Sequence, residues 1–420
     1  MEAILVNIAL PLASVVILLG VGLVLDRRRL RVVCCAVVCL GLVSACAVLP
    51  REPVPVDLTV PAQIPGMPGV RAVTGGTDAA MKRDFMQSLQ DESPEDFPVD
   101  ANGQTHYAAL ALSGGGAYGA FGAGFLKGWS ESGTRPVFKI VTGVSTGALT
   151  APFAFLGPRY DDMLHRFYTT TTTDDVLTRR SPLDALLRRD SLADATPLSV
   201  LLERYITADL LAQIAHAHRN GRRLYMGTVD LDSRRFVVWN MGLIATHGDE
   251  AALALFRKVM MASSAVPIVF SPVMIEVEAN GRRYDEMHVD GFVGANVFMN
   301  VGLFDTAKMY REAGRNARED IFIIHNGQHL APGRPTERSL RGIAERVVEA
   351  SGRSTIVGDL FREYAFAQRN GATFRWVTID PSVELADALS FDPVAMGRLY
   401  AVGYRVARGG QGWITQPPGF

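Results

Sequence analysis

Residues 107–153 read YAALALSGGGAYGAFGAGFLKGWSESGTRPVFKIVTGVSTGALTAPF and contain two strand–loop–helix units in succession. In the first unit an apolar strand ends in SGGG (residues 113–116), and in the second an apolar strand ends in GVSTG (residues 143–147). Small residues on both sides of Ser145 allow a strand to turn sharply into a helix, which places the serine hydroxyl on an exposed, strained tip. The sequence therefore predicts an α/β fold in which Ser145 is a nucleophile.

The glycine-rich loop of the first unit precedes a helix and leaves backbone N–H groups at its N-terminus, where the helix dipole also favours negative charge. Such a loop can hold the oxyanion that forms when a nucleophile attacks a carbonyl. A glycine-rich turn can also be read as a dinucleotide fingerprint. The second strand ends in the serine turn and not in an acidic residue, so the oxyanion interpretation is favoured. The predicted oxyanion-hole residues are Gly114, Gly115, Gly116 and Ala117.

These two motifs resemble the glycine-rich loop and the serine elbow of patatin-like acyl hydrolases, in the segments SGGGAYGAFGAGFL and GVSTG. That family uses a Ser–Asp dyad with the aspartate in a downstream Asp-Gly motif, which Asp290-Gly291 matches. Family members often carry a second glycine there, where this chain has Phe292. LYMGTVDLDSRRFVVWNMG resembles the family's paired central strands, and MASSAVPIVFSPV resembles its Ser-Ala-x-Pro segment. The resemblance covers about residues 107–297, with weaker similarity in the last helix.

The resemblance implies a serine acyl hydrolase of lipid esters, of the phospholipase A or lysophospholipase type, acting on phospholipid without a metal or an organic cofactor. Ser145 and Asp290 are the predicted catalytic residues. A carboxylate is a weak base for a serine hydroxyl, so partial desolvation is expected to raise the pKa of Asp290. The supporting motif residues are Gly143, Gly147 and Gly291, the last because it leaves room for the approach of Ser145.

Three alternatives remain open from the sequence. An α/β-hydrolase esterase would use a Ser-His-Asp triad, with His325 after a strand as its base, while His288 could lie behind Asp290. A lipid-anchored binding module without catalysis is the non-enzymatic alternative. Acyl transfer to an alcohol other than water would use the same residues as hydrolysis. His216 and His218 are spaced too closely to share one helix face, so no metal site is expected there.

Composition excludes several other classes of protein. The formal net charge is −1, which favours neither nucleic acid nor an acidic ligand. All four cysteines precede Ala47, so the folded part has no disulfide, no thiolate nucleophile and no cysteine metal site.

The N-terminal residues 1–45 predict a signal peptide or membrane segment. Ala3–Leu25 is long enough to span a bilayer, and Val32–Ala45 has the length of a signal-peptide core preceded by arginines. The run Val43-Ser44-Ala45-Cys46 resembles a bacterial lipobox, so Cys46 is the predicted lipid anchor. A transmembrane hairpin with an ordinary thiol is the alternative. We expect a protein of the bacterial cell envelope held at a membrane, the outer membrane being favoured.

Beyond the anchor, residues 46–102 are rich in proline, glycine and acidic residues and predict an extended tether with one short helix around Ala79–Leu89. Residues 103–420 form the predicted catalytic domain, with a core at 107–297 and a helical C-terminal part at 298–420. Alternating strands and helices predict a three-layer α/β/α sandwich around a mostly parallel central sheet of about six strands.

Two further segments bear on this domain. A helical insertion at residues 158–210 is expected to be solvated and could act as a lid. Glu337 to about Gln368 reads as one or two helices broken near Gly352.

Overall fold

The computed structural model describes residues 51–76, 78–180, 191–299, 303, 305–330, 333, 335–410 and 412–420. The chain divides into two units, and the second, Glu52–Arg179 with Ala193–Phe420, contains the central sheet. The first, Met1–Arg51 with Arg180–Leu192, falls almost entirely outside the described residues, and with it the predicted membrane segment and the predicted anchor Cys46. Within the described part of the chain, no helix combines the length and the apolar character needed to cross a membrane.

The second unit is built on a nine-stranded sheet in the order β1-β7-β6-β3-β2-β10-β11, with β9 beside β6 and β8 beside β9. The pairs that join β6, β3, β2, β10 and β11 are parallel, and the remaining pairs are antiparallel. The strands of the sheet are β1 (Arg71–Val73), β2 (Thr105–Leu112), β3 (Phe138–Gly143), β6 (Arg223–Asp230), β7 (Arg235–Asn240), β8 (Val273–Ala279), β9 (Arg282–Asp290), β10 (Ala317–His325) and β11 (Thr373–Thr378).

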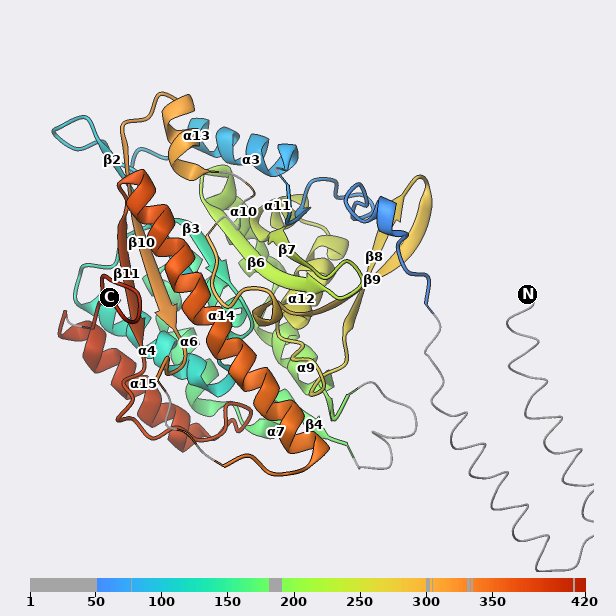
Figure 1. Ribbon diagram of the computed structural model, residues 1–420. Coiled ribbons are helices and arrows are strands. Elements are labelled where there is room, and N and C mark those ends of the chain that lie inside the picture. The colour runs from blue at the N-terminus through green and yellow to red at the C-terminus, as the bar shows by residue number, and fades with distance from the viewer. Residues whose placement is uncertain are drawn as a thin grey trace, which may run out of the picture. The chain divides into compact units, whose positions relative to one another are not determined.

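Helices cover both faces of this sheet, so the predicted α/β/α sandwich is confirmed (Figure 1). Successive residues of a strand point to opposite faces: Ala109 and Ile321 pack with α3, α13 and α14, whereas Leu110 and Ile324 pack with α4, α5 and α15. The helices are α3 (Ala79–Gln90), α4 (Gly119–Glu131), α5 (Thr146–Leu156), α6 (Asp161–Thr170), α7 (Thr173–Val176), α9 (Thr196–Tyr205), α10 (Ala208–Arg219), α11 (Met241–His247), α12 (Glu250–Ser263), α13 (Thr306–Glu312), α14 (Leu340–Asn370) and α15 (Pro393–Arg408).

The sheet is larger than the predicted six strands because β1 and the β8–β9 hairpin extend it. The hairpin turns at Asn280-Gly281, both with positive φ, and brings β9 back along β6. The long helix α14 runs through Gly352 without the expected break and crosses one face of the sheet (Figure 1). The insertion at 158–210 is helical as predicted, with α6, α7, α9 and the start of α10 around a short β4–β5 pair (Thr178–Arg179, Ala193–Asp194); residues 181–190 lie outside the described part, and the lid role stays a prediction.

The segment predicted as an extended tether packs against the sheet instead. Strand β1 pairs with β7, and α3 buries Met81, Phe85 and Leu89. These side chains recur at every fourth position, so they form one apolar face that is stabilised by covering the sheet. The prediction of a tether is therefore wrong for residues 52–102, although the short helix within it is confirmed.

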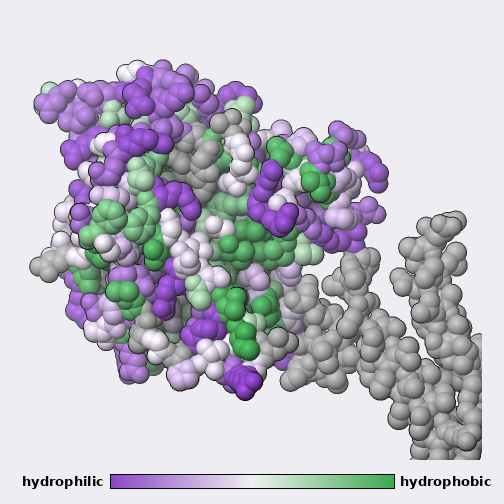
Figure 2. Space-filling view, viewed as in Figure 1, coloured by the Kyte–Doolittle hydropathy of each residue, from purple (hydrophilic) through white to green (hydrophobic). Residues whose placement is uncertain are grey.

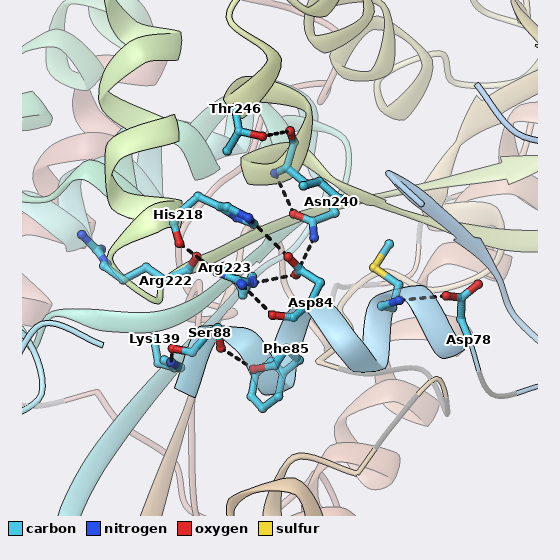
Figure 3. Close-up of polar contacts among 12 residues, drawn as sticks. Asp78, Asp84, Phe85, Ser88, Lys139, His218, Arg222, Arg223, Asn240 and Thr246 are labelled. Atoms are coloured by element: carbon cyan, nitrogen blue, oxygen red, sulfur yellow. Dashed lines mark hydrogen bonds and ion pairs between the residues drawn. The ribbon is translucent and has the colours of Figure 1, made fainter. Parts of the chain in front are cut away.

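A buried polar cluster fixes α3 in place (Figure 3). The Asp84 carboxylate accepts hydrogen bonds from Arg223 Nε at 2.6 Å and from Asn240 Nδ2 at 2.7 Å. His218 Nε2 lies 3.3 Å from the same carboxylate. From the sheet side, Lys139 Nζ donates to the Ser88 carbonyl at 3.0 Å. The helix is thus held by charge pairing as well as by its apolar face.

Removing the Asp84 carboxylate should destabilise the whole unit. Asp84→Ala leaves the Arg223 guanidinium buried without its carboxylate, and breaking a buried ion pair costs about 3–5 kcal/mol. We expect urea denaturation to show a loss of this size. Asp91→Ala at the C-cap of the same helix removes only an exposed side-chain hydrogen bond from Gln87 and should change the free energy of unfolding by less than about 0.5 kcal/mol. Equal effects of the two variants would contradict this account.

Candidate active site

Ser145 occupies the tight turn between β3 and α5, as predicted, but it is buried rather than on an exposed tip, with only 7% of its surface exposed. Its φ of 57° and ψ of −128° lie in a region that a residue with a side chain rarely adopts. A Cβ atom on Gly143 would lie 2.5 Å from the Gly147 carbonyl oxygen, and one on Gly147 would lie 2.2 Å from the Leu112 carbonyl oxygen. Both glycines are therefore required for the turn to close against β2.

Asp290 reaches the serine because β3 and β9 share one edge of β6. Gly143, the last residue of β3, pairs with Met226 of β6. Two residues further along the same edge of β6, Thr228 pairs with Asp290 of β9. The turn that carries Ser145 therefore lies next to the end of β9 that carries Asp290. A Cβ on Gly291 would lie 2.5 Å from the Gly227 carbonyl oxygen and 3.0 Å from Val144 Cγ1, so this glycine lets the two segments approach.

The Asp290 carboxyl group is fully buried and only half satisfied. Its Oδ1 accepts a hydrogen bond from the Phe292 N–H at 3.0 Å. Its Oδ2 makes no hydrogen bond of standard geometry to any described residue. Burial raises the pKa of Asp290 to about 7, while the Phe292 N–H and the nearby Ser145 side chain act in the opposite direction. The Asp290 carboxyl group is thus a desolvated base near Ser145, and its Oδ2 has an open acceptor position.

The glycine loop lies against Ser145, but only part of it is available to an oxyanion. A Cβ on Gly114 would lie 3.0 Å from Ser145 Cβ. The Gly114 N–H donates to Asn296 Oδ1 at 2.9 Å, and the Ala117 N–H donates to the Ala388 carbonyl at 2.8 Å. Neither group is therefore a free donor, and the prediction of an oxyanion-hole role is wrong for Gly114 and Ala117, while it stays a prediction for Gly115 and Gly116.

The N–H groups of Gly115 and Gly116 donate to no described residue. Gly115 has a φ of 148° and Gly116 a φ of 56°. A Cβ on Gly115 would lie 2.0 Å from the Asn326 carbonyl oxygen, and one on Gly116 would lie 2.2 Å from the Ala388 carbonyl oxygen. Only glycine fits either position, so the loop keeps two adjacent unpaired donors at the start of the short 3₁₀ helix η2 (Gly116–Tyr118), which precedes α4.

The histidines considered from the sequence have other partners. His325 Nδ1 lies 3.0 Å from Thr378 Oγ1 on β11, and burial lowers the pKa of His325 to about 3, with His329 acting in the same direction. His288 Nδ1 lies 2.9 Å from Thr228 Oγ1, and its Nε2 lies 3.1 Å from Glu286 Oε2. Within the described residues neither makes a hydrogen bond to Ser145 or Asp290, so the geometry does not favour a triad.

His216 and His218 are not brought together either. His216 Nε2 lies 3.1 Å from Asn220 Nδ2 at the surface, while His218 belongs to the Asp84 cluster (Figure 3). Across the described residues, no three histidine, cysteine or acidic side chains gather in a way that could hold a metal ion.

Three supporting residues were not predicted from the sequence. Ser263 Oγ accepts the Ser145 N–H at 3.1 Å and donates to the Gly227 carbonyl at 2.7 Å, joining the serine turn to β6. Asn296 and Asn326 each hold the glycine loop through their side chains. Ser263 lies in the segment MASSAVPIVFSPV, whose resemblance gave a signal, whereas nothing local marks either asparagine.

The patatin-like phospholipase family model matches residues 110–303, which include the glycine loop, Ser145 and Asp290. A search of curated proteins gave no match. Among solved structures, VipD from Legionella pneumophila has 12% identity and a TM-score of 0.31, over 75% of this chain and 69% of that one.

A chain of the complex of SpcU with ExoU from Pseudomonas aeruginosa has 15% identity and a TM-score of 0.26. That match covers 63% of this chain and 58% of the other. Both structural likenesses are distant, so the similarity to a known family rests on the family model alone. Residues 110–303, somewhat less than half of the chain, are similar to the patatin-like phospholipase family.

Proposed function

We propose that this chain is a serine acyl hydrolase of phospholipid esters, of the phospholipase A or lysophospholipase type, with Ser145 and Asp290 as a catalytic dyad. The observation that carries the proposal is the meeting of a strained serine turn and a desolvated carboxylate on one edge of β6. A serine hydroxyl needs such a base to become a nucleophile.

In the first half-reaction Ser145 Oγ attacks the ester carbonyl carbon while its proton passes to Asp290 Oδ2. The carbonyl oxygen becomes an oxyanion, which the Gly115 and Gly116 N–H groups stabilise. When the intermediate collapses, the bond to the alcohol oxygen breaks, and Asp290 returns the proton to that oxygen. An acyl group is then left on Ser145.

In the second half-reaction Asp290 removes a proton from water, and the resulting hydroxide oxygen attacks the acyl carbon. The second oxyanion uses the same two N–H donors. Its collapse releases the fatty acid, and the proton on Asp290 returns to Ser145 Oγ. The four steps use only groups of the protein, water and the ester.

An apolar surface beside the site supports a lipid substrate. Val293 follows the Asp290 turn in the short 3₁₀ helix η4 (Gly291–Val293), and α14 packs against this helix, with Gly352 near the Phe292 ring. Val293 on η4, together with Ile343 and Val347 on α14, exposes apolar side chains to solvent. Figure 2 shows apolar residues gathered beside and along the lower part of α14. Contiguous exposed apolar surface commonly marks a site that binds membranes or other apolar partners.

Covalent labelling tests the proposal. The full-length protein in detergent micelles is treated with a fluorophosphonate, which reacts with activated serines, and fatty-acid release from phosphatidylcholine is followed in parallel. We expect one adduct, located on the peptide that contains Ser145, and a loss of fatty-acid release in proportion to labelling. Micelles are used because Ser145 is only 7% exposed.

His325→Ala provides the control that separates dyad from triad, and it should retain both labelling and hydrolysis. Loss of labelling in that variant with its fold intact would support the triad instead. An adduct on another residue would overturn the assignment of Ser145. No adduct at all, with and without micelles, would leave the binding module as the better account.

A further inference from the structure

The glycine loop is held in place by a side chain from the far side of the site. Asn296 follows Asp290 by six residues and is 9% exposed. Its Oδ1 accepts the Gly114 N–H at 2.9 Å. A Cβ on Gly114 would meet both Ser145 Cβ at 3.0 Å and Asn296 Oδ1 at 3.2 Å. Asn296 therefore contacts the loop where it meets the serine.

A second asparagine holds the preceding residue. The Asn326 N–H donates to Ser113 Oγ at 2.8 Å, and its Nδ2 donates to the Ser113 carbonyl at 3.0 Å. The Ser113–Gly114 peptide is thus fixed from both sides. Consecutive glycines have unusual conformational freedom, so without such contacts the following N–H groups would sample many directions.

Asn296 is itself anchored to α14. Its N–H donates to Asp359 Oδ2 at 2.6 Å, and the Val297 N–H donates to the same oxygen at 3.1 Å. The Asn296 Nδ2 also donates to the Gly352 carbonyl at 3.4 Å. Asp359 is fully buried, and Arg362 Nη1 lies 3.0 Å from its other oxygen. A continuous path of hydrogen bonds therefore runs from α14 through Asn296 to the oxyanion loop.

We propose that Asn296 is a positioning residue, which orients the Gly115 and Gly116 N–H groups toward the oxyanion, and that Asp359 on α14 keeps Asn296 in that position. The inference rests on the proposed function. Oxyanion stabilisation depends on donors that are already oriented when charge develops, so a loosened loop would weaken the transition state more than it weakens substrate binding.

Asn296→Ala tests this with a short-chain ester and the full-length protein. Removing one oxyanion donor outright costs about 10²–10³-fold in kcat. A misoriented pair should cost less, so we expect kcat to fall about 10–100-fold with KM changed less than about threefold. The affinity of a trifluoromethyl ketone, which forms an oxyanion on the serine, should fall by the same factor as kcat/KM, whereas binding of a non-hydrolysable ether analogue should be unchanged.

The role of Asp359 is tested by a double-mutant cycle. Asp359→Ala and Asn296→Ala interrupt the same path, so the double variant should lose about as much activity as the more impaired single variant. Asp359→Asn keeps an acceptor oxygen and should restore most of the activity. Glu363→Gln is the matched control, because Glu363 is also buried on α14 but accepts the Met299 N–H at 3.2 Å and does not touch Asn296.

The outcomes separate this inference from the proposed function. An inactive wild type would contradict the proposed function. An active wild type with kcat of Asn296→Ala within about threefold would overturn the positioning role alone. If Asn296→Ala lost affinity equally for the trifluoromethyl ketone and for the ether analogue, the variant would have a general loss of structure. If the activity losses of Asn296→Ala and Asp359→Ala multiplied in the double variant, the link through Asp359 would be excluded.

Discussion

Replacement of Ser145 by alanine is expected to reduce ester hydrolysis by about 10⁴–10⁶-fold, to the background set by the remaining oxyanion donors. The variant keeps the turn, the glycine loop and Asp290, but it has no oxygen that could form the acyl-enzyme. Fatty-acid release and fluorophosphonate labelling should therefore disappear together. Full-length wild type and variant are compared at equal folded fraction, measured by thermal unfolding.

A glycine at the same position separates chemistry from backbone strain. Ser145 has a φ of 57° and a ψ of −128°, which glycine adopts without the steric cost of a Cβ. Ser145→Gly should be as inactive as Ser145→Ala but more stable than it, by about 1–3 kcal/mol. Hydrolysis that persists in both variants would show that another residue is the nucleophile. Equal stability of the two would show that the turn is not strained.

Local patterns were sufficient to predict the serine turn and its order in the chain. An apolar strand, a small residue on either side of Ser145 and an apolar helix are neighbours in sequence, and the geometry of the turn depends on little else. The same holds for the Asn280-Gly281 hairpin. The Asp-Gly pair was identified through resemblance, but its distance from Ser145 depends on the pairing of β6 with both β3 and β9, which no local pattern specifies.

The oxyanion loop shows why part of the site could not be predicted. The sequence gives four consecutive residues with backbone N–H groups, and only long-range contacts decide which of these groups remain unpaired. Asn296 and the Ala388 carbonyl take the first and the last of the four. These partners lie far from the loop in sequence, so their effect is invisible in the motif itself.

The segment predicted as a tether is likewise folded because it packs against the sheet. The segment is rich in proline, glycine and acidic residues, and composition alone favours an extended chain. The apolar face of α3 and the buried ion pair of Asp84 with Arg223 stabilise a folded segment instead, because both form only when α3 packs against the sheet. The spacing of residues in the sequence was sufficient to predict the helix, whereas the surface against which the helix packs could not be predicted.

Asp290→Asn should remove the general base and at the same time stabilise the fold. An amide cannot take the proton from Ser145, so we expect kcat to fall about 10²–10⁴-fold. In wild type the base must be deprotonated, and the pKa of Asp290 is raised to about 7 by burial. The kcat/KM of wild type should therefore rise with pH through about 7. The residual activity of the variant should not show this rise with pH.

The stability gain follows from the same pKa and has a defined sign. The pKa of Asp290 moves from 3.8 to about 7 on folding, so between these values the folded state holds a proton that the unfolded state has lost. Wild type then loses stability as pH rises from about 4 to about 7, at about 1.4 kcal/mol per pKa unit, and the cost is complete above that range. The asparagine side chain of the variant has the same shape as aspartate and can still accept the hydrogen bond from the Phe292 N–H, but it carries no buried charge. Urea denaturation should show the variant up to about 4 kcal/mol more stable at pH 8 and nearly equal to wild type at pH 4. A gain of the same size at both pH values would mean that the carboxyl group is not held in its neutral form by burial, and the dyad would lose its physical basis.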